Sequence, residues 1–331
     1  MSGNILKSVL QKCVQYCKGG NVNSKLNMAQ HKDDVFLQIG DFKVFAWSIS
    51  GIETSVVVRK PSDGFDCCFD MGYSSRENVK CQSVMISHGH MDHISAVPQH
   101  IKKRELLGGK PASYYVPEHL VEDVQELCNT YAKICENSEG LKAPNICGVK
   151  QGDRIKLHKG HFAVPFPTVH RVKSQGYIVY SAKKQLNPEF QGLSSKEIGA
   201  RIRDGENVHT DPVITPEIAF TGDTTFQVFT NEVYDPPPDL FKVKLLIVEA
   251  TYINDDCNIE ERVQQARKWG HIHLSEIYEN AELFKDVDNI LLIHMSDKYS
   301  CRYIQEKVFS NIPEALKGKV HVSTIAKERY L

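Results

Sequence analysis

The sequence contains no apolar run of the length that a membrane-spanning helix needs. None of its 331 residues lies in a stretch approaching ~20 apolar residues, which excludes an integral helical membrane protein. It also lacks an excess of either charge, because Lys and Arg number 40 and Asp and Glu number 41. A uniformly basic nucleic-acid binder is therefore excluded, although a local basic patch is not. Hydrophobic residues make up 41% and charged residues 24%, which excludes disordered and collagen-like chains.

Cysteine pairs with C-x-x-C spacing are absent, and so is the pattern of a secretory signal peptide. The ten cysteines are scattered, and two of them, Cys67 and Cys68, are adjacent within an apolar run. This usage favours reduced thiols in a reducing compartment. We therefore expect Cys67 and Cys68 to fill the core rather than to do chemistry.

Acidic residues are absent from residues 1–32, which carry five lysines and no arginine. Apolar side chains recur there at helical spacing as far as Gly19 and Gly20, so the stretch is basic and amphipathic. The lack of arginine argues against a mitochondrial import signal. We expect residues 1–34 to be a flexible basic segment, and the protein to reside in the cytoplasm or the nucleus, with a mitochondrial location as a weakly supported alternative.

The remaining residues, 35–331, alternate strand-like and helix-like segments and are expected to form a single domain. Strands are predicted over 35–39, 43–49, 55–58, 84–87, 161–166, 176–181, 217–221, 244–250 and 289–294, and helices over 118–136, 258–269, 274–285 and 302–309. Residues 182–212 are typical of an inserted loop or a partly helical excursion. Strands followed by helices, twice over, predict an α/β fold with four layers, an αββα sandwich.

Three histidines and a carboxylate follow the predicted strand at 84–86 within six positions. They are His88, His90, Asp92 and His93, in the spacing HxHxDH. Neutral imidazole and carboxylate are ligands that suit Zn²⁺ or a similar divalent ion. Four such side chains directly after a buried strand predict a metal site.

Further ligand-type residues end other predicted strands, namely His170, Asp223 and His294. Asp223 follows an apolar strand and Gly222, a position that suits a carboxylate bridging two ions. We therefore predict a two-metal site. His88, His90 and His170 would hold one ion, Asp92, His93 and His294 the other, and Asp223 would be shared.

This pattern resembles that of the metallo-β-lactamase fold hydrolases, and its finer features resemble ribonuclease Z, the endonuclease that trims tRNA 3′ trailers. The segments that carry the finer resemblance are 174–177, 215–225, 248–252, 270–275 and 292–296. The resemblance covers residues 40–325 and is greatest with the short, single-domain form. The Glu-Ala-Thr and Gly-His-x-His-x-Ser segments distinguish it from ordinary β-lactamases and glyoxalase II enzymes.

The resemblance implies a zinc-dependent endoribonuclease that leaves a tRNA 3′-hydroxyl and a trailer 5′-phosphate. It implies two Zn²⁺ per subunit, with Mn²⁺ as an alternative, and a homodimer acting on precursor tRNA. Asp92 would orient the attacking water or accept its proton. His271, paired with Glu249, would protonate the departing 3′-oxygen. His273 would either orient His271 or cap the local packing.

Two expectations concern the substrate. Lys298 stands where the resembled family has arginine, and lysine keeps the charge but loses planar bidentate contact with phosphate. We predict that Lys298 binds substrate and that the exchange alters either 3′-end recognition or turnover. Residues 105–145 are the candidate for the family's tRNA-gripping arm, although their acidic side chains are a poor electrostatic match. Candidate basic contacts are Lys102, Lys103, Arg104, Lys110, Arg171, Lys173, Lys183, Lys184, Arg201 and Arg203.

Two other functions remain compatible with the sequence. One is another dinuclear-metal phosphodiesterase of the same fold, acting on small phosphodiesters or other RNA. The other is a non-catalytic RNA-binding or scaffold protein that keeps the fold. The second is disfavoured because a protein without activity is expected to have lost a ligand, and all seven predicted ligands are present.

Overall fold

The computed structural model describes residues 36–136, 144–254 and 258–330. Residues 38–331 form one compact unit. The predicted flexible basic segment, residues 1–34, lies outside the described residues. Among the helices that are described, none has the length and apolarity required to cross a membrane.

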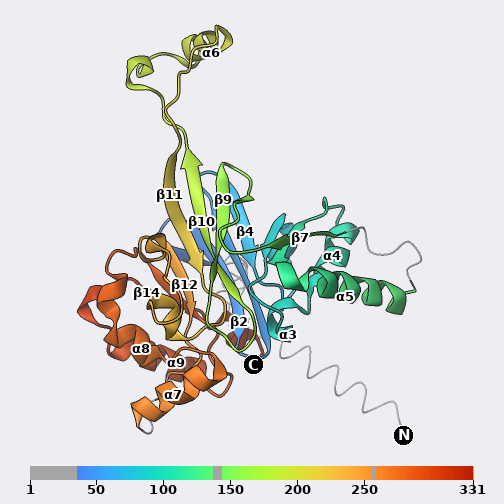
Figure 1. The fold of residues 1–331 in the computed structure, drawn as a ribbon, viewed down its shortest axis with the longest axis vertical. Coiled ribbons are helices and arrows are strands. Elements are labelled where there is room, and N and C mark those ends of the chain that lie inside the picture. Colours follow the sequence, from blue (N-terminus) through green and yellow to red (C-terminus); the bar gives the residue numbers. More distant parts are fainter. Residues whose placement is uncertain (1–35, 137–143, 255–257, 331) are drawn as a thin grey trace, which may run out of the picture. The chain divides into compact units, whose positions relative to one another are not determined.

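Seven strands form the first sheet, in the order of the chain (Figure 1). They are β1 (Leu37–Ile39), β2 (Phe42–Ile49), β3 (Glu53–Lys60), β4 (Phe65–Phe69), β5 (Ser83–Met85), β6 (Ser113–Pro117) and β7 (Asn145–Val149). β2, β3 and β4 pair antiparallel, whereas β4 to β7 pair parallel. The sheet is therefore mixed.

Seven strands also form the second sheet, in the order β14-β13-β12-β11-β10-β9-β8. They are β8 (Ile155–Lys156), β9 (His161–Pro167), β10 (Gln175–Lys183), β11 (Val213–Phe220), β12 (Leu245–Glu249), β13 (Ile290–Ile293) and β14 (Val320–Val322). β8 to β11 pair antiparallel and β11 to β14 parallel. Each sheet thus begins with antiparallel strands and ends with parallel ones.

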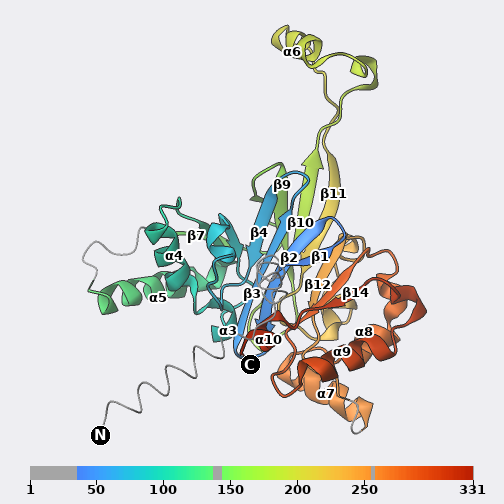
Figure 2. The ribbon, with the colours of Figure 1, turned by 180° about the vertical axis from the view of Figure 1, so that it is seen from behind.

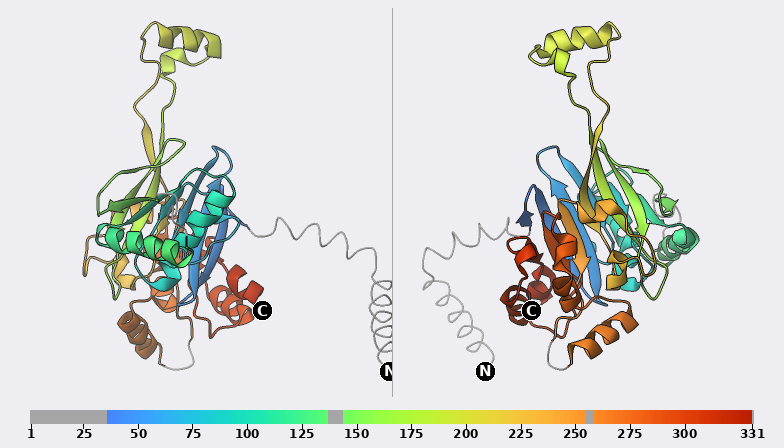
Figure 3. Two further views of the ribbon diagram at one scale, coloured as in Figure 1. Left: turned by 90° about the vertical axis from the view of Figure 1, so that its right-hand side faces the viewer. Right: turned by 60° about the vertical axis from the view of Figure 1, so that its left-hand side comes forward.

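Helices flank the two sheets on their outer sides (Figures 2 and 3). On the side of the first sheet they are α3 (Met91–Ile94), α4 (Val97–Leu106) and α5 (Val121–Ile134), and on the side of the second α7 (Ile259–Trp269), α8 (Leu274–Glu279) and α9 (Cys301–Ser310). A last helix, α10 (Ile325–Tyr330), packs against β2. The sheets meet where Phe69 and Phe220 stack with ring centroids 4.7 Å apart. The predicted αββα sandwich is confirmed, and Cys67 and Cys68 are buried within it.

The described parts of the segment 105–145 do not form a projecting arm, so that prediction is wrong for them. Its strands β6 and β7 pair along their length in the first sheet, and α5 lies against β7. The segment that does project lies between β10 and β11, at residues 184–212 (Figure 1). It contains α6 (Ser195–Arg203), which Ser194 and Glu197 cap reciprocally. The predicted partly helical excursion at 182–212 is therefore confirmed.

A buried ion pair joins the two sheets. Lys60 on β3 places its Nζ 2.6 Å from Oε2 of Glu217 on β11, and the two side chains are 4% and 2% exposed. The other oxygen, Oε1, accepts hydrogen bonds from Ser181 Oγ at 2.7 Å and Lys244 Nζ at 3.3 Å. Burial opposes ionisation of Glu217, but Lys60 and Ser181 lower its pKa below the ordinary value. The Glu217 carboxylate is therefore ionised at neutral pH.

Lys60→Met is expected to lower the free energy of unfolding by ~3–5 kcal/mol, because it leaves a buried carboxylate without its closest cation. Urea denaturation followed by circular dichroism measures this loss. Lys183→Met is the matched control, since Lys183 is a half-exposed lysine near the same sheet edge. The double variant Lys60→Met/Glu217→Leu should recover most of the stability. Equal stability of Lys60→Met and Lys183→Met would contradict this role for the pair.

Candidate metal centre

The predicted ligands lie at the carboxyl ends of strands from both sheets. β5 leads into His88, β9 into His170, β11 into Asp223 and β13 into His294. Because β11, β12 and β13 are parallel, their carboxyl ends meet at one edge of the sheet, the usual place for a site in such sheets. Residues more than 200 positions apart in the chain therefore come together here.

The first cluster consists of His88, His90, His170 and Asp223, with one ligand atom from each lying within 4.8 Å of the others. His90 Nδ1 is 3.0 Å from His88 Nε2 and 3.2 Å from His170 Nε2. Burial lowers the pKa of all three imidazoles below the ordinary value, so they are neutral at pH 7. Neutral imidazole is the form that ligates metal ions.

The second cluster consists of Asp92, His93, Asp223 and His294. Asp92 Oδ2 lies 3.3 Å from Nε2 of both His93 and His294. Asp223 Oδ1 lies 3.3 Å from His93 and 3.4 Å from His294. The other oxygen of Asp223, Oδ2, lies 3.9 Å from His88 Nε2 in the first cluster. The two oxygens of Asp223 therefore face different clusters, the arrangement expected of a shared carboxylate.

These residues fit a dinuclear metal site. His93 Nε2 is buried and has no hydrogen-bond partner among the described residues, although it points at two carboxylates. Burial opposes ionisation of Asp92 and Asp223, but His294 and His93 hold both pKa values well below the ordinary range. Two buried, ionised carboxylates among imidazoles favour a cation, and N and O donors suit divalent transition metals.

Further side chains orient the ligands from behind. Asp70 Oδ2 accepts hydrogen bonds from His93 Nδ1 at 2.7 Å and from Ser87 Oγ at 2.9 Å. His294 Nδ1 lies 3.0 Å from Thr251 Oγ1. Such contacts fix the tautomer of a ligating histidine and leave Nε2 free for the metal. Sequence reasoning missed Asp70, and the available signal was its place directly after the buried strand β4.

Two glycines and one strained residue shape the loops of the site. Gly222 has φ +60°, and a Cβ there would lie 2.6 Å from Cβ of Ser87. Gly270 has φ +81°, and a Cβ there would lie 2.5 Å from Nδ1 of His170. Both positions therefore require glycine. His294 itself has φ +63°, a strain of ~1–3 kcal/mol that is common at functional sites.

A carboxylate–imidazole pair lies beside the second cluster. His271 Nδ1 is 3.0 Å from Oε1 of the fully buried Glu249, and the backbone N–H of Thr224 and the hydroxyl of Thr251 also donate to this carboxylate. Burial lowers the pKa of His271, but Glu249 more than offsets this and raises it to about 9. His271 is therefore protonated at neutral pH. Together with His294 the pair could hold a metal ion, but Glu249 already accepts several hydrogen bonds, which favours a proton-holding pair.

His273 has a structural environment. Its Nδ1 accepts from the backbone N–H of Ser275 at 3.3 Å, and its Nε2 lies 3.0 Å from the carbonyl oxygen of Asn254. The residue is buried and caps α8. Of the two alternatives for His273, the structure favours capping.

Lys298 and His271 both lie close to the ring of Tyr252. Its Nζ is 5.2 Å from the ring centroid of Tyr252 and 4.8 Å from that of Tyr299, and it donates to Asn254 Oδ1 at 3.3 Å. The rings of Tyr252 and His271 are 6.2 Å apart between centroids. The cation is thus held near the candidate proton donor, within reach of an anionic substrate.

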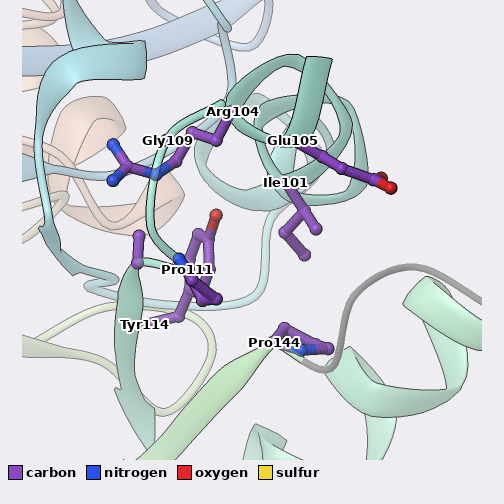
Figure 4. Close-up of a pocket in the computed structure, with 8 residues that line it drawn as sticks. Ile101, Arg104, Glu105, Gly109, Pro111, Tyr114 and Pro144 are labelled. Carbon is purple, nitrogen blue, oxygen red and sulfur yellow. The ribbon is translucent and has the colours of Figure 1, made fainter. Parts of the chain in front are cut away.

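Two grooves and one small pocket lie on the surface of the described residues. A groove of about 300 Å³ runs beside the His170 loop and is lined by Lys150, Lys173 and His119, among others. A larger groove of about 840 Å³ is lined by Met91, Tyr131 and Lys102, among others. A third, small pocket lies between α4 and Pro144 (Figure 4). Arg104, at its edge, donates to the carbonyls of Val79, Cys81 and Lys110, which indicates a structural role there rather than contact with a substrate.

Comparisons with known proteins agree with this geometry. The family model of the beta-lactamase superfamily domain matches residues 65–295. The chain is 37% identical to tRNase Z TRZ1 of Arabidopsis thaliana over 87% of this chain and 97% of that protein. It is 30% identical to the chloroplastic tRNase Z TRZ2 of the same plant, over 87% of this chain and 76% of that protein. The fold resembles the crystal structure of the short form of human tRNase Z, with a TM-score of 0.53, 17% identity, and coverage of 85% of this chain and 96% of that one.

Proposed function

The chain belongs to the ribonuclease Z (tRNase Z) family of the β-lactamase superfamily, and on that basis we propose that it is a metal-dependent endoribonuclease that removes 3′ trailers from precursor tRNA. The observation that carries the proposal is the pairing of two buried His/Asp clusters that share Asp223 with a protonated His271 beside them. Together they supply the ligands and the proton donor that hydrolysis of a phosphodiester needs. Residues 35–331 would act as one catalytic domain.

The ligand sets proposed for two Zn²⁺ ions are the two clusters. His88, His90 and His170 would hold one ion, Asp92, His93 and His294 the other, and Asp223 would be shared. Bound zinc or manganese would supply Lewis-acid stabilisation of phosphate charge and an activated water. The chain's own contribution is to present neutral imidazoles and ionised carboxylates in fixed positions, since Asp70, Thr251 and Gly270 hold the ligands from behind.

Proton transfer is assigned to His271. Glu249 binds its Nδ1, so the proton on Nε2 is the one available to the substrate. As the bond between phosphorus and the ribose 3′-oxygen breaks, His271 would give this proton to the departing oxygen. The products would be a tRNA 3′-hydroxyl and a trailer 5′-phosphate. Asp92 has a pKa well below the ordinary value, which favours orienting the water over accepting its proton.

Binding of the precursor would use the cations around the site. Lys298, held between two tyrosine rings, would contact a phosphate near the cut as a point charge. Lys150 and Lys173, in the groove beside the His170 loop, offer further positive charge to the backbone. These cations are local, in keeping with the formal net charge of -1.

A homodimer and a cytoplasmic or nuclear location also belong to this proposal. Large apolar side chains are exposed near the groove lined by Met91 and Tyr131, and they include Met91 at 79% and Ile134 at 70% exposure. Such surface supports a protein contact. For the location, a wheat relative named nuclear ribonuclease Z matches 49% of this chain at 30% identity.

The decisive experiment is cleavage of a 3′-extended precursor tRNA by the purified full-length protein in zinc and in manganese, with His90→Ala beside it. Cutting after the discriminator base is expected, with loss of cutting in His90→Ala because the first cluster loses a ligand. Bis(p-nitrophenyl) phosphate serves as a generic diester in the same assay. Hydrolysis of this diester without cutting of the precursor would overturn the tRNA assignment and favour another phosphodiesterase of the same fold.

A further inference from the structure

An exposed tryptophan and an arginine lie together next to the proposed catalytic residues. Trp269 is the last residue of α7 and is 46% exposed. The guanidinium carbon of Arg171, which is also exposed, lies 4.9 Å from the centroid of its ring. Trp269 has no role in the site described above, and Arg171 enters it only as one of the candidate basic contacts.

The backbone joins this pair to two histidines of the site. Arg171 directly follows His170, and Trp269 lies two residues before His271. Between them, His170 Nδ1 donates to the carbonyl oxygen of Gly270 at 2.8 Å. The rings of His170 and His271 are 5.4 Å apart between centroids. The Trp269–Arg171 pair is therefore held at the rim of the site, on the side of the proton donor.

Packing explains Trp269 only in part. It lies three positions after Ala266, the buried residue of α7, and so on the same side of the helix, yet 46% of its surface stays exposed. The second tryptophan of the sequence, Trp47, shows the contrast, because it is 7% exposed and stacks on Tyr73 at 4.2 Å. Aromatic rings and guanidinium planes are the groups on which proteins stack the unpaired bases of RNA.

We propose that Trp269 and Arg171 form a stacking platform for the nucleobase on the 5′ side of the scissile phosphate, an inference that rests on the proposed function. His271 gives its proton to the 3′-oxygen of that upstream nucleotide, so the groups that flank His271 face its ribose and base. Trp269 supplies the ring, and Arg171 supplies a cation that orients the ring and attracts the neighbouring phosphate.

The platform would position the substrate without reading its sequence. Every base has a π-face, so stacking accepts all four bases at the discriminator position. A 3′-processing enzyme needs this tolerance, because tRNAs differ at that nucleotide. The platform would therefore fix where the chain is cut rather than which tRNA is chosen.

Tryptophan emission tests stacking directly in the metal-loaded full-length protein. The probe is a mature tRNA ending at the discriminator nucleotide, which is the proposed product and cannot be cut again. Excitation at 295 nm should show quenching of the exposed tryptophan on titration, and little quenching in Trp269→Phe, which retains buried Trp47. The same tRNA with an abasic terminal nucleotide should quench weakly. Unchanged emission on binding, detected by gel shift, would overturn the platform.

Kinetics on the precursor provide a second test. Trp269→Ala should lower kcat/KM for the precursor by ~5- to 150-fold, the range for loss of one stacked base, and Trp269→Phe should recover most of it. In the wild type, a precursor that lacks the base upstream of the cut should show a similar loss of kcat/KM. In Trp269→Ala, removing that base should lower kcat/KM little further. Phe309→Ala, which removes a 49% exposed ring on α9, is the matched control. If the loss from Trp269→Ala and the loss from removing the base are independent of each other, the platform is overturned.

These outcomes separate the platform from the proposed function. Cleavage of precursor tRNA without quenching by the product leaves the endonuclease assignment standing and removes the platform. Quenching by the product tRNA without any cleavage of the precursor supports the platform as a binding site for RNA and removes the endonuclease assignment.

Discussion

Asp223→Ala is expected to abolish cleavage of precursor tRNA and to lower the metal content below two ions per chain. The rate should fall by at least ~10³-fold, because the shared carboxylate supports both ions on which activation of the water depends. No other described side chain faces both clusters with two oxygens, one 3.3 Å from His93 and the other 3.9 Å from His88. Inductively coupled plasma mass spectrometry gives the metal content, and single-turnover cleavage gives the rate.

The control for this experiment is Asp235→Asn, which changes an exposed carboxylate just after a turn. It should retain the metal content and the rate of the wild type. Circular dichroism of Asp223→Ala distinguishes loss of metal from loss of fold. A folded Asp223→Ala protein that keeps two ions and cuts at the wild-type rate would refute the shared-ligand assignment.

His271→Ala is expected to lower kcat by ~10²–10⁴-fold while both ions stay bound, because it removes the proton donor but none of the seven proposed ligands. Added imidazole should restore part of the rate if the missing group is a proton donor. Loss of metal from His271→Ala would instead identify His271 as a ligand of the third residue group, with Glu249 and His294.

The pH dependence tests the role of Glu249. His271 has a pKa of about 9, so its donor form is present below that pH and is lost as the pH rises through it. Glu249→Gln removes the charge that raises this pKa, so the alkaline limb of kcat should move toward lower pH. When the pKa of His271 in Glu249→Gln lies at or below the ordinary 6.5, kcat at pH 8 falls by at least ~30-fold relative to the wild type, and the loss at pH 6 is smaller. Glu232→Gln, on an exposed carboxylate, should leave the profile unchanged. An unshifted profile in Glu249→Gln would contradict the pairing.

The ligand residues could be predicted from sequence because each follows an apolar strand directly. HxHxDH after β5, and a single His or Asp after β9, β11 and β13, gave every residue that the structure brings into the two clusters. Their metal-binding role is a proposal still to be tested. Glu249 and His271 came from the resemblance, and the structure places them in contact.

The specific contacts behind the ligands could not be predicted, because they depend on which strands are neighbours in a sheet and on how the two sheets face each other. Asp70 reaches His93 across 23 positions and Ser48 Oγ meets the backbone N–H of His294 across 246. Strand β4 was missed because it is buried along most of its length and so lacks the alternation that marks a half-exposed strand. Strands β6 and β7 are short, and β7 lies at the end of the sheet, has a single buried residue and contains Gly148, so neither has a clear strand pattern. The assignment of residues 105–145 to the arm came from the resemblance alone, and the pairing of β6 with β7 in the first sheet contradicts it.

The placement of residues 184–212 has a consequence for how this enzyme family diversifies. The segment leaves and rejoins the sheet through adjacent strands, with Lys183 on β10 paired to Val213 on β11, and no residue of α6 is buried. Lengthening such a connection costs little free energy, since closure entropy grows only slowly with length. Insertions, deletions or replacements there would leave the ligand-bearing strand ends unaltered. Changes of sequence or length there can therefore alter what the segment touches without moving the proposed metal ligands.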